Sequence, residues 1–498
     1  MTGLERETNV ERLRDAVRLL ARENEKLIKL NIELKNALAA ARGEQAKQLE
    51  LQIAELEQQL AVRNKTLFGD SSERRASDTA ARAEPKVKQP GHGPRQQSLP
   101  VVEKIHELDV ADRTCTSCGG ELSEWEGQFE QSREVDMYER RFVELHHKRK
   151  KYRCACGGCV ETAPGPLKLM AGGRYSIDIA ISIVVAKYGD HSPLERLARG
   201  LGRQGLVIDS QTLWDQINAL ARILSPVHDA LQAAVLAQPV IGADETHWKL
   251  MGEKTSGKKT KRWQVWAITS SKLVCYRIKA GRSTKDAADV LGDYRGVVVC
   301  DGYVVYSSLH KQQPAITLAN CWSHVRRKYV EVEEVEPGRC AEMIDLIGKL
   351  FEVEARAREG DLDDEALLAL RQAESKAHVD AIQVWMLSQR VLPQSPLGKA
   401  IAYTASLWDG LTLFLGNAAV PVDNNATERA LRGVVIGRKN HYGSRSQRGT
   451  EVAALFYSII ETCKLVDADP YDYLRDATYA ALKGEPIPLP GERDHGLV

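Results

Sequence analysis

Hydrophobic residues near the start of the chain recur with the spacing of a coiled coil. Apolar side chains, interrupted by two asparagines, alternate at intervals of four and three over residues 13–38, and the pattern resumes over residues 49–60. This spacing places Asn24 and Asn31 at a positions, where asparagine favours a parallel pair of helices. Residues 1–62 are therefore predicted to form a leucine zipper that pairs two copies of the chain. A long helix docked on its own protein has the same pattern.

Strand-like runs of apolar residues begin at residue 239. The segment PVIGAD predicts a short strand that ends at Asp244, and RWQVWAIT and KLVCYRIK predict two more strands joined by a tight serine turn. STKDAADVLGDY predicts a helix capped by Ser283, and GVVVC predicts a buried strand that ends at Asp301. A right-handed crossover through this helix would return the last strand parallel to the first. That order predicts a ribonuclease H-like core, with the two aspartates about 5 Å apart on neighbouring strands.

Helical periodicity surrounds these strands. Residues 192–224 predict a helix, a short turn and a second helix with Asp209 or Ser210 as its N-cap. Helix-turn-helix DNA-binding proteins and ordinary helical hairpins share this pattern, so it indicates DNA binding only weakly. Helices are also predicted over much of residues 326–415. The fold class is therefore multidomain α+β.

Cysteines gather in two short clusters. Residues 63–100 are rich in Ser, Arg, Ala, Gly and Pro without periodicity, which predicts a flexible linker. Four thiolates from two knuckles hold zinc in a tetrahedron, so residues 101–165 are predicted to form a zinc ribbon. Reduced structural cysteines are the alternative. Cys115 and Cys118 are the first pair of predicted Zn²⁺ ligands, and the second pair is either Cys154 with Cys156 or Cys156 with Cys159.

The length and the N-terminus of the chain limit where it acts. Its 498 residues suffice for several domains, and the charged N-terminus has no apolar signal core. No uncharged apolar stretch approaches the roughly 18 residues that a membrane-spanning helix needs. We therefore expect a cytoplasmic protein with no membrane partner.

The overall charge of +1 conceals two basic runs. Between Arg140 and Arg153, seven Lys and Arg residues accompany one Glu, and between Arg429 and Arg448 six accompany no acidic residue. Basic runs are most often solvated surface, but each of these lies beside a motif with its own chemistry, which favours contacts with phosphate. The residues expected to bind DNA are Lys148, Arg149, Lys150, Lys151, Arg326, Arg327, Arg429, Arg432, Arg438 and Lys439.

The two strand-end aspartates predict a divalent-cation site. Carboxylates so close repel each other unless a cation lies between them. Their oxygens suit Mg²⁺ or Mn²⁺, and two such ions about 4 Å apart promote phosphoryl transfer. Glu428 is the candidate for a third ligand, because it begins a predicted helix that carries the second basic run. Asp244, Asp301 and Glu428 are therefore the predicted catalytic residues and metal ligands. Glu245 should point to the opposite face of its strand and is left out.

Several blocks of the chain resemble those of bacterial insertion-sequence-66 family transposases. They are IGADETHWKL, LGDYRGVVVCDGYVVY, CWSHVRRKY and DNNATERALRGVVIGRKNHYGS, and the resemblance continues in order through the zipper, the cysteine clusters and AKYGDHSPLERL. It implies a DDE transposase with a helical insertion before the glutamate, and a triad at Asp244, Asp301 and Glu428. The segment CACGGC departs from the family pattern, because it has one cysteine more than a simple ribbon needs.

Pattern and resemblance together predict the order of parts along the chain. These are a leucine-zipper coiled coil (1–62), a flexible linker (63–100), a zinc ribbon (101–165), a helix-turn-helix-like DNA-binding segment (166–235), a ribonuclease H-like catalytic domain (236–325 and 416–460), its helical insertion (326–415) and a C-terminal helical region (461–498).

The predicted function is transposition of an insertion sequence at the bacterial nucleoid, by metal-dependent DNA strand cleavage and strand transfer. The expected partners are DNA, a second copy of the chain and, where the element encodes them, helper proteins. A nuclease that cuts without joining is one alternative, although it would need neither zipper, ribbon nor insertion. A DNA-binding regulator without catalysis is the other, and the intact triad argues against it.

Five further residues each have two interpretations. Cys321 and His324 have half the spacing of a metal site, but no second pair is evident, so a packed cysteine and a histidine at a helix start are favoured. Asn424 and Asn425 could cap the helix of Glu428 or bond DNA, and capping is favoured. Trp248 could stack on a flipped base or pack in the core.

Overall fold

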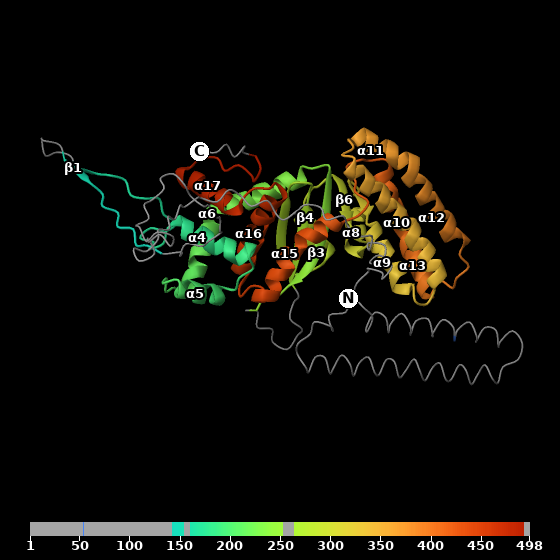
Figure 1. The fold of residues 1–498 in the computed structure, drawn as a ribbon, viewed down its shortest axis with the longest axis horizontal. Helices are drawn as coiled ribbons and strands as arrows, with labels where there is room; N and C mark the ends of the chain where they lie inside the picture. Colours follow the sequence, from blue (N-terminus) through green and yellow to red (C-terminus); the bar gives the residue numbers. More distant parts are fainter. Residues whose placement is uncertain (1–52, 54–141, 154–159, 252–262, 493–498) are drawn as a thin grey trace, which may run out of the picture. The chain divides into compact units, whose positions relative to one another are not determined.

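The computed structural model describes residue 53 and residues 142–153, 160–251 and 263–492 (Figure 1). The predicted linker, most of the zipper and all five clustered cysteines lie outside these residues, so the zipper, the ribbon and its zinc stay predictions. Strands β1 (Lys151–Arg153) and β2 (Val160–Thr162) pair antiparallel on either side of the last three of those cysteines. In the part of the chain that is described, no helix is both long and apolar enough to cross a bilayer.

A five-stranded mixed sheet has the order β5-β4-β3-β6-β7. Its strands are β3 (Val240–Trp248), β4 (Trp263–Thr269), β5 (Val274–Lys279), β6 (Gly296–Cys300) and β7 (Ile316–Asn320). β4 runs antiparallel to both β3 and β5, whereas β6 runs parallel to both β3 and β7. The predicted parallel return of the last strand beside the first is confirmed. β7, which was not expected from the sequence, extends the sheet beyond β6.

Successive side chains of the central strands point to opposite faces of the sheet, and different helices cover the two faces. Helices α7 (Thr284–Leu291) and α8 (Val304–Gln312) pack on one face, where Ile241, Ala243 and Val298 join their hydrophobic core. Ser283 caps α7, as predicted, in a capping box with Asp286. The other face carries Gly242 and is covered by α15 (Asn425–His441) and α16 (Gln447–Leu465), which contact β3 and β5 respectively (Figure 1).

Helices before and after the sheet share one core with it. α4 (Ile177–Val184), α5 (Leu194–Arg203) and α6 (Ser210–Leu236) precede the sheet, and α17 (Pro470–Lys483) follows α16. Buried side chains of α4, α6, α16 and α17 join residues of β4 and β5 in a single hydrophobic cluster. Asp209 caps α6, as predicted, because its Oδ1 accepts a hydrogen bond from Thr212 N at 2.6 Å.

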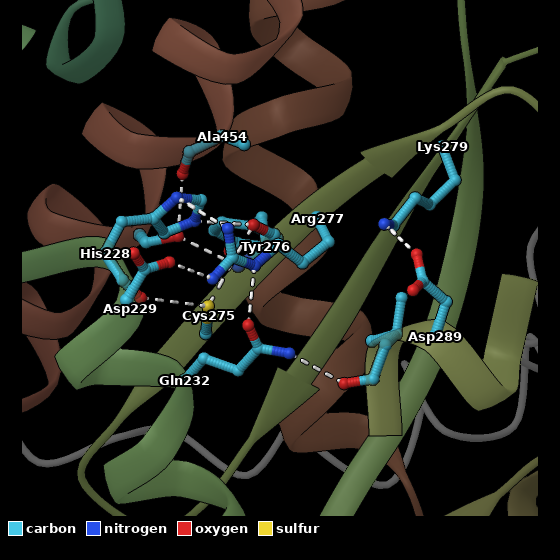
Figure 2. A network of polar contacts seen from close by, with 11 residues as sticks. His228, Asp229, Gln232, Cys275, Tyr276, Arg277, Lys279, Asp289 and Ala454 are labelled. Carbon is cyan, nitrogen blue, oxygen red and sulfur yellow. Dashed lines mark hydrogen bonds and ion pairs between the residues drawn. The ribbon is translucent and has the colours of Figure 1, made fainter. Parts of the chain in front are cut away.

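A polar network fixes the middle of α6 to the edge strand β5 (Figure 2). The Arg277 guanidinium donates to Gln232 Oε1 and to Asp229 Oδ1, each at 2.8 Å, and the His228 Nε2 atom lies 2.8 Å from Tyr276 O. Burial lowers the pKa of His228 to about 4, so this ring is neutral near pH 7. The network therefore orients α6 on the sheet with directional bonds as well as apolar packing.

The helices predicted over residues 326–415 are present and build a second core between β7 and α15. They are α9 (Trp322–Val332), α10 (Pro337–Glu359), α11 (Asp364–Leu370), α12 (Lys376–Ser388), α13 (Pro396–Ser406) and α14 (Trp408–Thr412). Trp322, Tyr329 and Trp385 are buried in this core. A buried Arg371 forms a two-pronged ion pair with Glu354, at 2.7 and 2.8 Å, which fixes how these helices pack.

The two ends of this helical insertion are bonded to each other. Trp322 N, at its entrance, donates to Val422 O at 3.1 Å, and Asn424 N donates to Cys321 Sγ at 3.2 Å. The chain therefore leaves the sheet and returns to it at one place, directly before α15.

Gly242 allows α15 to lie against β3 at close range. A Cβ atom added at this residue would lie 2.0 Å from Thr427 Oγ1 and 2.7 Å from Thr269 Oγ1. Those two hydroxyl groups are buried and hydrogen-bonded to each other at 2.8 Å. Two short, packed side chains have little room to move, so a larger residue would push the helix away from the strand.

We expect Gly242→Ala to lower the free energy of unfolding by about 1 to 3 kcal/mol, the usual cost of overpacking. The matched control is Gly348→Ala in α10, where an added Cβ meets nothing within 4 Å and helix propensity should stabilise by up to about 1 kcal/mol. Urea unfolding of both variants measures the difference. A Gly242→Ala protein as stable as the control would show that α15 is not held by this close approach.

Candidate active site

Asp244 and Asp301 occupy equivalent places on neighbouring parallel strands. The last pair of the β3–β6 ladder is Gly242 with Val299; Asp244 lies two residues further along β3, and Asp301 lies two residues further along the chain, directly after the end of β6. A step of two residues keeps a side chain on the same face, so both aspartates lie on the face that α15 covers. The sequence-based placement of these two residues as neighbours is supported by this register.

The expectation that the first strand ends at Asp244 is wrong. β3 continues to Trp248 because its antiparallel partner β4 continues to pair with it, from Asp244 with Ala267 to Trp248 with Trp263. Only the parallel partner stops, since β6 ends at Cys300. Asp244 therefore lies within a strand that is paired on one side and open on the other.

Glu428 lies in the first turn of α15, and that turn is bonded to the sheet. Asn424 Nδ2 donates to Ala243 O of β3 at 3.0 Å, and Thr427 Oγ1 lies 2.8 Å from Thr269 Oγ1 of β4. Asn424 occupies the N-cap position of α15, as the favoured interpretation expected, but its side chain makes no capping hydrogen bond. Its amide holds the helix start to β3 instead.

Electrostatic effects indicate that the three carboxylates are close. Burial, together with the negative charges of Glu245, Asp301 and Glu428, raises the pKa of Asp244 to about 7, against a backbone hydrogen bond that lowers it. That bond is donated by Glu245 N to Asp244 Oδ1 at 2.7 Å. Asp301 Oδ1 accepts a hydrogen bond from Tyr303 N at 3.0 Å. The site therefore concentrates negative charge that its own hydrogen bonds only partly offset.

Glu245 belongs to the other side of β3, as alternation predicts. Its Oε1 accepts a hydrogen bond from Arg282 Nε at 2.5 Å, and its Oε2 accepts one from Tyr306 OH at 2.7 Å. The Arg282 guanidinium also lies 3.7 Å from the centre of the Tyr303 ring. A partnered, fully buried carboxylate of this kind stabilises the strand on which Asp244 lies.

His324 lies beside Glu428, a position that the favoured interpretation of the sequence did not predict. It lies in the first turn of α9, as the favoured interpretation expected, but its Nε2 is 3.5 Å from Glu428 Oε1. Burial lowers the pKa of His324, while the charges of Glu428 and Asp301 act to raise it. Cys321, three residues earlier, is buried and accepts the hydrogen bond from Asn424 N. The sequence feature that could have identified His324 is the CWSH spacing, but this spacing alone does not predict that His324 contacts Glu428.

The predicted DNA-binding residues divide into two groups on α15. Arg429, Arg432 and Lys439 are exposed along one face of the helix. Arg438 is half-buried, and its guanidinium donates to Thr246 Oγ1 at 3.2 Å and to His247 O. Arg438 therefore ties the end of α15 to β3, whereas the other three face solvent.

The remaining predicted DNA contacts lie elsewhere. Arg326 and Arg327 are on α9, two and three residues after His324. Lys148, Arg149, Lys150 and Lys151 are exposed before and at the start of β1. Trp248 is a core residue, only 1% exposed, so its ring is not available to stack on a base.

Comparisons with known proteins identify the family of the chain. The sequence profile described as "Transposase IS66 family" matches residues 172–452, which include the three carboxylates. The uncharacterized protein y4jD of Sinorhizobium fredii (strain NBRC 101917 / NGR234) is 31% identical over 68% of each chain. The uncharacterized protein y4hP of the same organism is 27% identical over 91% of this chain and 84% of its own. The chain thus belongs to the IS66 family of transposases.

Proposed function

We propose that the chain cleaves DNA at the ends of its insertion sequence and joins those ends to target DNA, with Asp244, Asp301 and Glu428 as a DDE triad. One observation supports this most directly: Asp244 and Asp301 each lie two residues beyond the last pair of the β3–β6 ladder, and the first turn of α15, which carries Glu428, is bonded to β3. In this proposal three carboxylates approach one another, from β3, from the residue after β6 and from α15, which is a costly arrangement unless a cation compensates it. The strand order β5-β4-β3-β6-β7 supports the proposal, because it is the order expected of a ribonuclease H-like core.

The chemistry of these residues fits Mg²⁺ or Mn²⁺. All three donors are carboxylates, and Glu428 Oε1 is buried without a hydrogen-bond partner. Such hard oxygen ligands suit these ions. Among the residues that the structure describes, no three His, Cys, Asp or Glu side chains yet surround a single point closely enough to hold an ion, so binding would draw them together. When bound, the cation would activate the attacking oxygen and stabilise the leaving oxygen.

Cleavage and joining follow from two exchanges at phosphorus. Water attacks the phosphodiester at an element end, a new P–O bond replaces the broken one, and a 3′ hydroxyl group is released. That hydroxyl group then attacks a phosphodiester of the target, and the second exchange joins the strands without a covalent protein intermediate. The exposed cations of α15 are suited to hold the phosphate backbone beside Glu428, and the predicted zipper and ribbon would pair and bind the ends.

We expect Asp244→Asn, Asp301→Asn and Glu428→Gln to lower nicking of element-end DNA by at least about 10³-fold, as for residues that act as one catalytic unit. Binding of the same DNA should change little, because none of these side chains is a cation. The control is Asp293→Asn, on an exposed loop before β6.

Nicking and joining in Mg²⁺ are followed on labelled DNA by denaturing gels. Normal nicking by any of the three variants would refute the triad. Efficient nicking by the unsubstituted protein without any joined product would identify a nuclease instead.

Asp244 should also lower the stability of the cation-free protein at neutral pH. Its pKa is about 7 when folded, against about 3.9 for a free Asp side chain, so the folded state holds the extra proton between these values. Stability from this group is therefore lost as pH rises from about 4 to 7 and stays lost above. We expect Asp244→Asn to raise the thermal midpoint by about 2 to 5 °C at pH 8 in EDTA, and by less as pH falls towards 4. A pH-independent gain, or none, would contradict this view of the site.

The exposed cations of α15 should act through phosphate charge. We expect Arg429→Ala with Arg432→Ala to weaken DNA binding of every sequence similarly and to reduce the slope of log affinity against log salt by about 2. Arg475→Ala on α17, whose guanidinium is paired with Asp472, serves as the control. Fluorescence anisotropy at several salt concentrations measures both quantities. An unchanged slope would place the phosphate contacts elsewhere.

A further inference from the structure

His324 and Glu428 lie against each other, and each has one buried polar atom without a hydrogen-bond partner. His324 Nδ1 and Glu428 Oε1 both lack a partner, and His324 Nε2 lies 3.5 Å from that same Glu428 oxygen. The contact is longer than a good hydrogen bond, and leaving a buried polar group unsatisfied typically costs about 1 to 3 kcal/mol. Packing alone does not account for an imidazole and a carboxylate held together in this state.

The helix starts that carry His324 and Glu428 are fixed by hydrogen bonds. The starts of α9 and α15 are joined through the hydrogen bond from Asn424 N to Cys321 Sγ. Trp322, next to Cys321, is fully buried and donates its Nε1 to Leu411 O at 2.8 Å. The side chains of His324 and Glu428 therefore face each other from two anchored helix starts, and Asp301 is near enough for its charge to act on His324.

We propose that His324 is a fourth protein ligand of the divalent cation held by Asp301 and Glu428, binding through the ring nitrogen that faces Glu428. This inference rests on the proposed function. Two neighbouring ligands of a six-coordinate ion with bonds of about 2.1 Å lie roughly 3 Å apart. The observed 3.5 Å thus requires a shift of only a few tenths of an ångström. One nitrogen among carboxylate ligands favours Mn²⁺ over Mg²⁺, compared with carboxylates alone.

The measurement that tests His324 as a ligand is the magnetic coupling between bound Mn²⁺ and the nitrogen nuclei of its ligands. Full-length protein is loaded with one equivalent of Mn²⁺ and examined by electron spin-echo envelope modulation. We expect ¹⁴N coupling of a directly bound imidazole, replaced by ¹⁵N coupling when the protein is grown with ¹⁵N-histidine. His324→Gln should abolish the coupling and weaken Mn²⁺ binding by about tenfold or more. His310→Gln should preserve both, because the His310 ring lies on α8 and contacts Ile316 O instead.

The outcomes separate the two levels of inference. Mn²⁺ binding that depends on Asp301 and Glu428 but shows no nitrogen coupling, or coupling that survives in His324→Gln, would overturn the role of His324 and leave the carboxylate site standing. Mn²⁺ binding that Asp301→Asn leaves unchanged would overturn the proposed function itself. The ¹⁵N-histidine sample tests the ligand in the unsubstituted protein, so the result stands even if His324→Gln folds poorly.

Discussion

The close contact of α15 with β3 at Gly242 is the constraint on which the site depends. Side chains normally keep the backbone of a helix at a distance from the backbone of a strand. A glutamate in the first turn of a helix comes close to a strand residue only where the strand has no side chain between the two backbones. Gly242 provides that gap two residues before Asp244, and Thr427 fills it one residue before Glu428. The bond from Asn424 to Ala243 O fixes the rotation of the helix about the same point. The position of Glu428 is therefore set by the strand that carries Asp244.

The contact of α15 with β3 brings negatively charged side chains together, and other contacts of the fold offset part of their repulsion. Glu245, on the opposite face of β3, is neutralised by Arg282 and bonded to Tyr306, so the strand carries one compensated and one uncompensated carboxylate side by side. The burial of Asp244 strengthens the repulsion, because it excludes water from the carboxylate. A site of this kind is less stable empty than filled, which is the usual relation between stability and function at a binding centre.

Much of the sheet could be predicted from sequence because its strands are short apolar runs separated by strong turn and cap signals. Ser283 and Asp209 mark helix starts by chemistry that needs no tertiary partner. β3 was expected to end too early, since polar residues after Ala243 resemble a loop unless the pairing with β4 is known. The roles of Asn424 and His324 were missed for a related reason. Each role depends on a contact with an atom more than a hundred residues away in the chain, and the local sequence pattern does not predict such a contact.

The bond between Trp322 N and Val422 O makes the helical insertion a closed excursion from the sheet. The two ends of the insertion are bonded together where α15 begins, so the insertion is a loop whose closure entropy depends only weakly on its length. The start of α15 can therefore keep its position when the length of the insertion changes. Natural variation in the excursion would then alter what the protein touches without moving Glu428. The proposed catalytic centre and the insertion could in this way diverge at different evolutionary rates within a single continuous chain.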